Sequence, residues 1–216
     1  MEHPIPPPRW QRRKEARPSE ITAAALALFV QRGFSATKLD DVAKAAGITK
    51  GTLYLYFASK EELFKAAVRD TWEPSLQLAE EMIADTQHDA TSLLETLLLS
   101  WIDLIQASPA NGISKLAIAE AGNFPELAQF YQQEIVDRSR RIFGKVIERG
   151  MQRGEFRQVD IGFMVTEIIS PIIMQTLWQQ AFGPYCKTSP DLPGFARFHL
   201  DLLLNGLRTA SAHQHI

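Results

Sequence analysis

One short stretch of the chain, GITKGTLYLYF at residues 47–57, gathers side chains that donate hydrogen bonds to phosphates and to the edges of bases. A helix that begins after the glycine places these groups on one face: Thr49, Lys50, Thr52, Tyr54 and Tyr56. Gly51 lies among them and lets the backbone approach a surface closely. Because exposed amides at a helix N-terminus also attract phosphate, the stretch predicts a helix that fits the major groove of DNA, which is about 12 Å wide. Solvated polar residues beside a half-buried tyrosine are the alternative interpretation.

An amphipathic helix precedes this stretch and is predicted to begin at Ser19 and to end at Gly33. Its apolar residues recur with the period of a helix and are Ile21, Ala25, Leu28 and Phe29. This face is expected to be the core of the N-terminal part.

A second short helix is predicted between Gly33 and the glycine turn at Gly47. Thr37 has the position of an N-cap, and Asp40 follows it three residues later, which is the spacing of a capping box. Gly47 can take the left-handed conformation that ends a helix, and a third helix follows over about 49–57. Short helices joined by glycine turns are typical of a helix-turn-helix unit.

The third helix is also expected to have a buried side. Leu53 and Phe57 are four residues apart, so both point toward the apolar residues of the first two helices. Ser59 and Glu62 then repeat the capping-box spacing and predict the start of a fourth helix.

Charge is distributed unevenly along the 216 residues. Residues 1–70 hold twelve Lys or Arg against eight Asp or Glu, whereas residues 71–216 hold eleven against seventeen. A basic smaller part joined to an acidic larger part indicates that the first meets a polyanion. The first 17 residues are proline-rich and then basic, and are predicted to be a flexible arm. The arm is either a solvated tail or a source of additional phosphate or minor-groove contacts.

Composition argues against several other classes of protein. The chain is 45% hydrophobic and 22% charged, as in ordinary soluble domains. A single cysteine, Cys186, favours a reducing compartment. Apolar runs such as IISPIIM at 168–174 are expected to be too short to span a membrane. No metal-ligand spacing, phosphate-binding glycine loop or nucleophile motif is found, and adjacent Asp40 and Asp41 cannot act as an acid–base pair. We therefore expect neither an enzyme nor a metal or cofactor site.

Beyond residue 70 the helical pattern continues in longer elements. They are predicted over roughly 75–85, 90–107, 110–121, 125–153, 159–182 and 195–211. Pro171 interrupts the fifth of them and is expected to bend its axis. The predicted fold is all-α, with a three-helix N-terminal domain at 18–64 and a larger helical bundle at 65–216.

The segment RGFSATKLDDVAKAAGITKGTLYLYFASKEELF resembles the N-terminal pattern of TetR-type bacterial transcriptional regulators, and the resemblance extends over residues 19–68. It implies that Thr37 caps the second helix onto a phosphate and that residues 49–52 lie at the groove-facing start of the recognition helix. It further implies phosphate contacts from Tyr54, Tyr56 and Lys60, and base contacts from Lys50 and Thr52. Position 56 is often His in relatives. Tyr56 keeps a hydroxyl donor, but the pH-dependent contact that a histidine could make is not expected from it.

The segment IAEAGNFPELAQFYQQEI at 118–135 is similar to a helix junction in the AefR-type subgroup of these regulators. The resemblance to the family implies that the last two long helices pair with their copies in a homodimer. It also implies a ligand domain that takes a small, hydrophobic effector. The candidates for its pocket are Trp101, Ile105, Glu120, Phe124, Phe163, Glu167, Met174, Gln175 and Trp178.

Together these features predict a bacterial, cytoplasmic repressor that binds a palindromic operator in double-stranded DNA, joins the nucleoid when bound, and is released by its effector. Two alternatives stay open. An activator or a DNA-binding protein without ligand control would share the N-terminal domain. A helical carrier of lipids that uses its basic part on membranes would bind anionic vesicles instead, and the glycine-turn motif argues against it.

Overall fold

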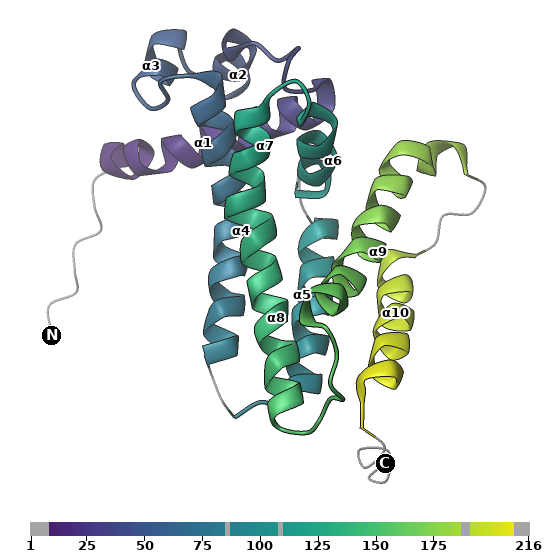
Figure 1. The fold of residues 1–216 in the computed structure, drawn as a ribbon. Coiled ribbons are helices and arrows are strands. Elements are labelled where there is room, and N and C mark those ends of the chain that lie inside the picture. Colours follow the sequence, from purple (N-terminus) through teal and green to yellow (C-terminus); the bar gives the residue numbers. More distant parts are fainter. Residues whose placement is uncertain (1–8, 85–86, 108–109, 187–190, 210–216) are drawn as a thin grey trace, which may run out of the picture. The chain divides into compact units, whose positions relative to one another are not determined.

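The computed structural model of the chain describes residues 9–84, 87–107, 110–186 and 191–209. The regular elements in these ranges are helices, and extended backbone pairs there only in an isolated bridge between Phe156 and Arg208. Figure 1 shows the helices in chain order. The predicted all-α fold class is confirmed.

The chain divides into two compact units, residues 1–71 and 72–216. The sequence places the boundary after residue 64, whereas the contacts place it after residue 71, within helix α4 (Lys60–Ala84). The first turns of α4 therefore belong to the smaller unit and its later turns to the larger one.

The smaller unit is formed by α1 (Arg9–Arg32), α2 (Leu39–Ala45), α3 (Lys50–Tyr54) and the start of α4. Three phenylalanines from α1, the following turn and α4 form its centre. The ring centroids of Phe29, Phe34 and Phe64 lie 5.2, 5.8 and 5.5 Å apart, in tilted and edge-to-face arrangements that aromatic quadrupoles favour. Leu53 of α3 is fully buried as predicted.

Two glycines end helices in this unit, as the sequence predicts. Gly33 and Gly47 have φ of 87° and 66°, a conformation that costs other residues free energy. After α2, the Ile48 amide donates to the Ala43 carbonyl at 2.9 Å and the Gly47 amide donates to the Lys44 carbonyl at 3.2 Å. This Schellman pattern turns the chain sharply from α2 into α3.

Two predicted boundaries in this unit are wrong. Helix α1 begins at Arg9 rather than Ser19 and runs through Pro18, because residues 9–17 are mostly good helix formers. Residues 1–8 of the predicted flexible arm lie outside the described residues. Helix α3 is shorter than the predicted 49–57 and ends at Tyr54, because the Tyr56 amide closes a tighter turn onto the Leu53 carbonyl.

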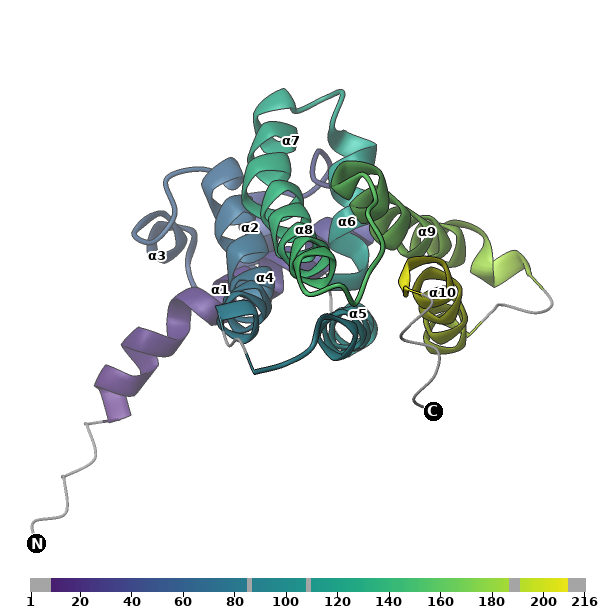
Figure 2. The same ribbon diagram turned by 60° about the horizontal axis from the view of Figure 1, so that its bottom comes forward.

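The larger unit is a bundle of long helices. It comprises the rest of α4 together with α5 (Ala90–Ala107), α6 (Ala110–Glu120), α7 (Pro125–Tyr131), π-helix η1 (Gln132–Val136), α8 (Asp137–Gln152), α9 (Ile161–Phe182), 3₁₀-helix η2 (Gly183–Tyr185) and α10 (Leu192–Leu207). Helices α5 and α9 each pack against α6, α8 and α10, and Figure 2 shows α5 and α8 nearly end-on. The strongly apolar α5 supplies much of the core.

The predicted helices of this unit agree with the structure to within a few residues, with two exceptions. The helix predicted over 75–85 is the end of α4, which continues through Pro74. The helix predicted over 125–153 is three elements, since a π-helix separates α7 from α8. Periodicity cannot locate a π-helix, because it inserts only about one residue into the pattern.

The expectation that no apolar segment approaches a membrane span is wrong in one place. Residues Ile161–Tyr185, which contain α9, are long and apolar enough to cross a membrane by length and composition. Packing against α6, α8 and α10 covers part of this helix. Only 22% of its most apolar stretch is buried, so a large apolar surface stays uncovered.

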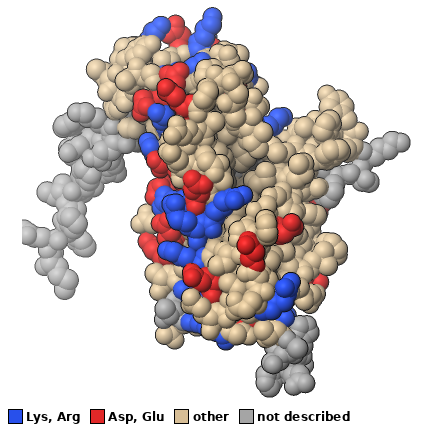
Figure 3. All heavy atoms as spheres, in the orientation of Figure 1, with Lys and Arg blue, Asp and Glu red and all other residues tan. Residues whose placement is uncertain are grey.

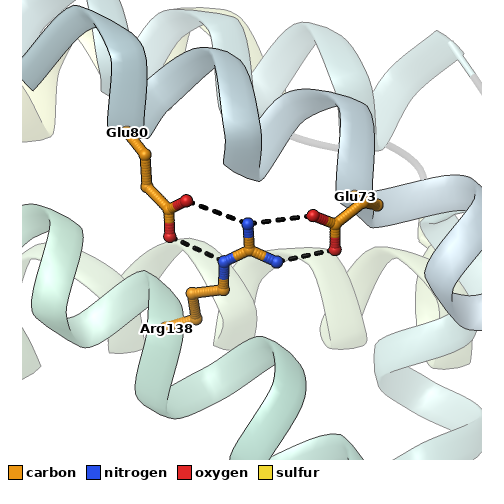
Figure 4. Close-up of polar contacts among 3 residues, drawn as sticks. All are labelled: Glu73, Glu80 and Arg138. Atoms are coloured by element: carbon orange, nitrogen blue, oxygen red, sulfur yellow. Dashed lines mark hydrogen bonds and ion pairs between the residues drawn. The ribbon is translucent and has the colours of Figure 1, made fainter.

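A double ion pair joins α8 to α4 in the larger unit (Figure 4). The Arg138 guanidinium donates to both carboxylate oxygens of Glu73, at 2.6 and 3.0 Å, and to both of Glu80, at 2.6 and 2.9 Å. These hydrogen bonds lower the pKa of Glu80 and raise that of Arg138. Basic and acidic side chains accordingly gather side by side over α4 and α8 in Figure 3. Bidentate pairs on both sides fix the arginine more firmly than a single contact would.

Candidate functional site

Thr49, the first residue of the stretch 47–57 that is predicted to contact DNA, forms the N-cap of helix α3. Thr49 has extended backbone angles, and its hydroxyl oxygen accepts the Thr52 amide at 3.1 Å. The two threonine hydroxyls lie 2.9 Å apart. This local hydrogen bonding fixes the start of α3 and leaves Thr49 exposed.

Lys50 reaches from α3 to α2. Its ammonium lies 2.8 Å from the Asp40 carboxylate, and both side chains are more than half exposed. The hydrogen bond and the charge of Asp40 raise the pKa of Lys50. Because exposed ion pairs contribute little to stability, the lysine can exchange this partner for another anion at small cost.

The remaining predicted residues, on α3 and in the turn after it, form a surface of mixed exposure. The Tyr54 side chain is 48% exposed, whereas Thr52 and Tyr56 are half-buried. At Gly51 an added Cβ would lie 3.9 Å from the Thr49 hydroxyl, which is ordinary contact, so packing within the chain does not require a glycine there. The absence of a side chain leaves the backbone open to an approaching surface.

Two predicted phosphate contacts are corrected by the structure. The N-cap of α2 is Lys38, not Thr37. Thr37 is 1% exposed and donates its hydroxyl to the Gly33 carbonyl at 2.8 Å, so it holds the turn after α1 and has no free surface for a phosphate. Lys60 donates to the carbonyls of Phe34, Ser35 and Thr37, at 2.9, 3.3 and 3.2 Å, and these acceptors occupy its three N–H groups.

Other charged groups of this unit were missed or given a different role by sequence reasoning. Asp40 and Asp41, in the first turn of α2, form ion pairs with Lys50 at 2.8 Å and with Arg32 at 3.4 Å. Lys38 and Lys44 are exposed at the two ends of α2. No sequence motif includes these two lysines. They are candidates for DNA contacts only because α2 packs beside α3.

The larger unit contains two adjoining hollows. The larger one has a volume of about 580 Å³ and is lined from α4 through α9. The smaller one, of about 100 Å³, lies among α4, α5, α8 and α9. Both are lined by Trp72, Trp101, Ser139 and Ile169. A combined volume in this range is typical of small-molecule sites.

Of the predicted pocket residues, only Trp101 and Met174 line these hollows. Ile105 is buried in the core, while Phe163 is 76% exposed and Trp178 is also largely exposed. Outside the lining lie Ile105, Glu120, Phe124, Phe163, Glu167, Gln175 and Trp178. Phe163, Glu167, Gln175 and Trp178 lie on α9, whose apolar residues occur on every face, so its period does not reveal which side is inward.

Several lining residues were not predicted. Tyr131 of α7 shares a hydrogen bond of 3.1 Å with Ser114 of α6, and burial raises the pKa of the tyrosine. The π-helix contributes Gln132, Ile135 and Val136 to the wall. Such helices often occur at functional sites. Trp72 was not predicted to line a pocket. It lies within α4, as the first residue of the larger unit, and belongs to no recognisable motif.

An apolar surface remains uncovered on α9, η2 and α10. Its exposed side chains are Phe163, Met174, Trp178, Phe182, Tyr185, Phe198 and Leu202. The rings of Trp178 and Phe182 contact each other in a tilted arrangement, with centroids 4.7 Å apart. Exposed apolar side chains of this number on neighbouring helices are typical of an interaction surface. In the described part of the chain, no cluster of three metal-binding side chains is found.

Comparison with known proteins gives consistent matches for both units. Residues 21–67 match the model of bacterial regulatory proteins of the tetR family, and residues 84–184 match that of a tetracyclin repressor-like C-terminal domain. The HTH-type transcriptional repressor KstR2 of Rhodococcus jostii is 29% identical over 93% of this chain and 94% of its own length.

Two solved structures share the fold. The regulator FadR from Bacillus subtilis, solved in complex with stearoyl-CoA, has a TM-score of 0.70 and 23% identity over 87% of this chain and 98% of its own. The ketosteroid transcriptional regulator KstR2 of Mycobacterium tuberculosis has a TM-score of 0.61 and 24% identity over 89% and 95%. The narrower likeness to the AefR-type subgroup stays a prediction.

Proposed function

Because the chain belongs to the tetR family of bacterial regulatory proteins, whose members regulate transcription and are not enzymes, we propose that it is a repressor that leaves its operator when a small effector binds. The observation that carries the proposal is the exposed polar face of α3, which lies within the family match and presents Lys50 and Tyr54. A helix of this kind fits the major groove.

In this proposal α3 reads the DNA and its neighbours orient it. Lys50 and Thr52 contact base edges, and Tyr54 and Tyr56 donate to phosphates, with Thr49 and Gly51 at the entry to the groove. Lys50 leaves Asp40 for the DNA, which costs little because both groups are exposed in the free protein. Thr37 and Lys60 act indirectly, since they hold the turn between α1 and α2.

The proposed active species is a homodimer. The uncovered apolar surface on α9 and α10 supports this, because it lies on the two long helices that the family resemblance assigns to subunit pairing. A second copy would bury the same residues on both sides of a two-fold axis. Two recognition helices related by that axis require a near-palindromic operator with half-sites about 34 to 36 Å apart, or somewhat more.

The proposed effector site is the pair of hollows around Trp72 and Trp101. Their apolar walls suit a hydrophobic molecule. One solved relative is named a ketosteroid transcriptional regulator, and another was crystallised with stearoyl-CoA, which has a long apolar acyl chain. An effector can release DNA only if it binds better to a conformation that does not fit the operator. Helix α4 connects the two units covalently and carries Trp72, so it is the proposed path of that change. As a DNA-binding regulator, the protein would work in the bacterial cytoplasm.

The proposal is tested by fluorescence-anisotropy titration of labelled DNA from the region upstream of the gene, with a scrambled duplex as control, at fixed salt. We expect a preference of at least about a thousandfold for the native duplex. Lys50→Met should weaken binding to it by about tenfold or more. Lys145→Met removes the same charge from an exposed position in the larger unit and should change affinity little. Equal affinity of the wild-type protein for both duplexes, or equal effects of the two variants, would contradict the proposal.

A further inference from the structure

The indole N–H of Trp72 is a buried hydrogen-bond donor without an acceptor. Trp72 is 3% exposed, and its Nε1 atom has no partner within the part of the chain that the structure describes. The same side chain lines both hollows of the larger unit. Buried donors are nearly always paired in native proteins, because an unpaired one loses its bond to water and gains nothing in return. The Nε1 atom has almost no accessible surface in the free protein, so a molecule in the cavity that brings an acceptor removes this penalty once the wall around Trp72 shifts to uncover the N–H.

The described walls of both hollows carry no charged side chain. They consist of apolar residues together with uncharged polar ones: Ser75, Ser100, Ser114, Tyr131, Gln132, Ser139 and Ser170. The hydroxyls of Ser114 and Tyr131 already pair with each other, and the Gln132 amide donates to Asp137 at 2.7 Å. A carboxylate or ammonium placed among these walls would lose its hydration without meeting an opposite charge. The cavity therefore selects against ionised groups.

We propose that the effector is an uncharged, largely apolar molecule with a carbonyl-type oxygen, and that Trp72 donates its indole N–H to that oxygen. The inference rests on the proposed function, because the occupant of the cavity is taken to be the effector. Trp101, which lines both hollows, supplies a flat apolar wall to the ring or chain that carries the oxygen.

The position of Trp72 gives this hydrogen bond a regulatory consequence. Trp72 is the first residue of the larger unit and lies on α4, whose preceding residues belong to the DNA-binding unit. An effector held by this donor binds directly to the helix that joins the two units. A hydrophobic molecule without the oxygen would fill the cavity but would lack this directed contact.

The test uses two probes of matched shape, cyclodecanone and cyclodecane, with decanoate as the ionised comparison. Their affinities are measured by displacement of the neutral fluorescent dye N-phenylnaphthylamine from wild-type protein and from the variants Trp72→Phe and Trp101→Phe. Phenylalanine keeps an aromatic ring and removes the donor. The ratio of ketone to hydrocarbon affinity should fall by about three- to tenfold in Trp72→Phe and stay unchanged in Trp101→Phe. Decanoate should bind more weakly than either neutral probe to the wild-type protein.

A ratio that Trp72→Phe leaves unchanged overturns the inference while the effector cavity stands, because both probes still bind. If neither neutral probe displaces the dye from the wild-type protein, the proposed effector cavity fails along with the inference. A second measurement needs no folded Trp72 variant. In ¹⁵N-labelled protein the four indole signals are assigned with Phe variants of the other three tryptophans. Cyclodecanone, but not cyclodecane, should shift the Trp72 signal, and a signal unmoved by the ketone overturns the inference.

Discussion

Lys60 contacts Phe34 in two ways: its ammonium lies 2.9 Å from the Phe34 carbonyl oxygen and 4.4 Å from the centroid of the Phe34 ring. The same ammonium donates to the Ser35 and Thr37 carbonyls. Phe34 is fully buried among Phe29 and Phe64. Lys60 therefore stabilises the core and the turn of the DNA-binding unit, and its three donors are already used without DNA.

Replacing Lys60 by Met should lower the free energy of unfolding by about 1–3 kcal/mol, because three carbonyls lose a charged donor. Urea denaturation measures this loss. Lys44→Met is the matched control, since Lys44 is exposed at the end of α2 and should change stability by less than about 0.5 kcal/mol. An unchanged stability in Lys60→Met, together with a shallower salt dependence of DNA binding, would mean that Lys60 contacts a phosphate after all.

Replacing Asp40 by Asn should tighten operator binding by about two- to fivefold, because Lys50 no longer has an internal partner to leave. Asp41→Asn is the control, since it removes the same charge from the neighbouring residue but breaks the pair with Arg32. Both variants make the DNA-binding unit more positive by one charge, but only Asp40→Asn releases Lys50 from its ion pair. A difference between them therefore measures the effect of that release on DNA affinity. Equal affinities of Asp40→Asn and Asp41→Asn, measured by anisotropy at one salt concentration, would show that the ion pair has no part in binding.

Much of the fold could be predicted from the sequence, because it depends on local interactions. Ser59 accepts the Glu62 amide at 3.2 Å and Gly47 takes a positive φ, as their spacing predicts. The start of α1 at Arg9 could not be predicted from the sequence, because Pro18 lacks an amide hydrogen and is typical of a helix boundary. Helix α1 nevertheless runs through Pro18, since the residues before it are mostly good helix formers.

The site was less predictable, because the roles of its residues depend on partners far away in the sequence. The spacing around Thr37 suits a cap, but its hydroxyl is used by Gly33. The role of Lys60 depends on a turn 26 residues earlier. In α9, large apolar residues occur on all sides, so sequence alone could not tell that Phe163 and Trp178 lie only on the exposed surface while Met174, also exposed, borders the larger hollow. Only the three-dimensional packing assigns these side chains to a surface or to a cavity.

Replacing Trp178 by Glu should convert the proposed dimer to monomers. The substitution places a charge beside Phe182 in the exposed apolar surface of α9, where subunit association would have to desolvate it. Sedimentation velocity measures the change in mass, and operator affinity should fall with it. Gln106→Glu adds the same charge at an exposed position on α5 and should leave the association state unchanged. A Trp178→Glu protein that keeps the wild-type mass would place the interface elsewhere.

Two glycines of the larger unit should respond to alanine in opposite directions. At Gly150 an added Cβ would overlap the buried ring of Phe156, so Gly150→Ala should lower stability by about 1–3 kcal/mol. At Gly206, within α10, nothing lies within 4 Å of an added Cβ. Gly206→Ala should therefore raise stability by about 0.5–1 kcal/mol through helix propensity. Thermal unfolding of both variants checks the pair, and a change of the same sign in both would contradict the packing around Phe156.

Replacing Arg138 by Met should lower stability at neutral pH by about 1–2 kcal/mol, a modest value because Glu73 and Glu80 are partly exposed. Arg138 lowers the pKa of Glu80 below its ordinary value of 4.5. A carboxylate whose pKa is lower in the folded state stabilises the protein fully above the unfolded pKa, and this contribution disappears as the pH falls through the folded pKa. The difference between wild type and Arg138→Met should therefore shrink below about pH 4.5. Arg141→Met, which removes only a longer-range charge from Glu80, should have a smaller effect. A difference that stays constant from pH 7 to pH 3 in urea denaturation would mean that the aliphatic stem of Arg138, and not its charge, stabilises the contact between α4 and α8.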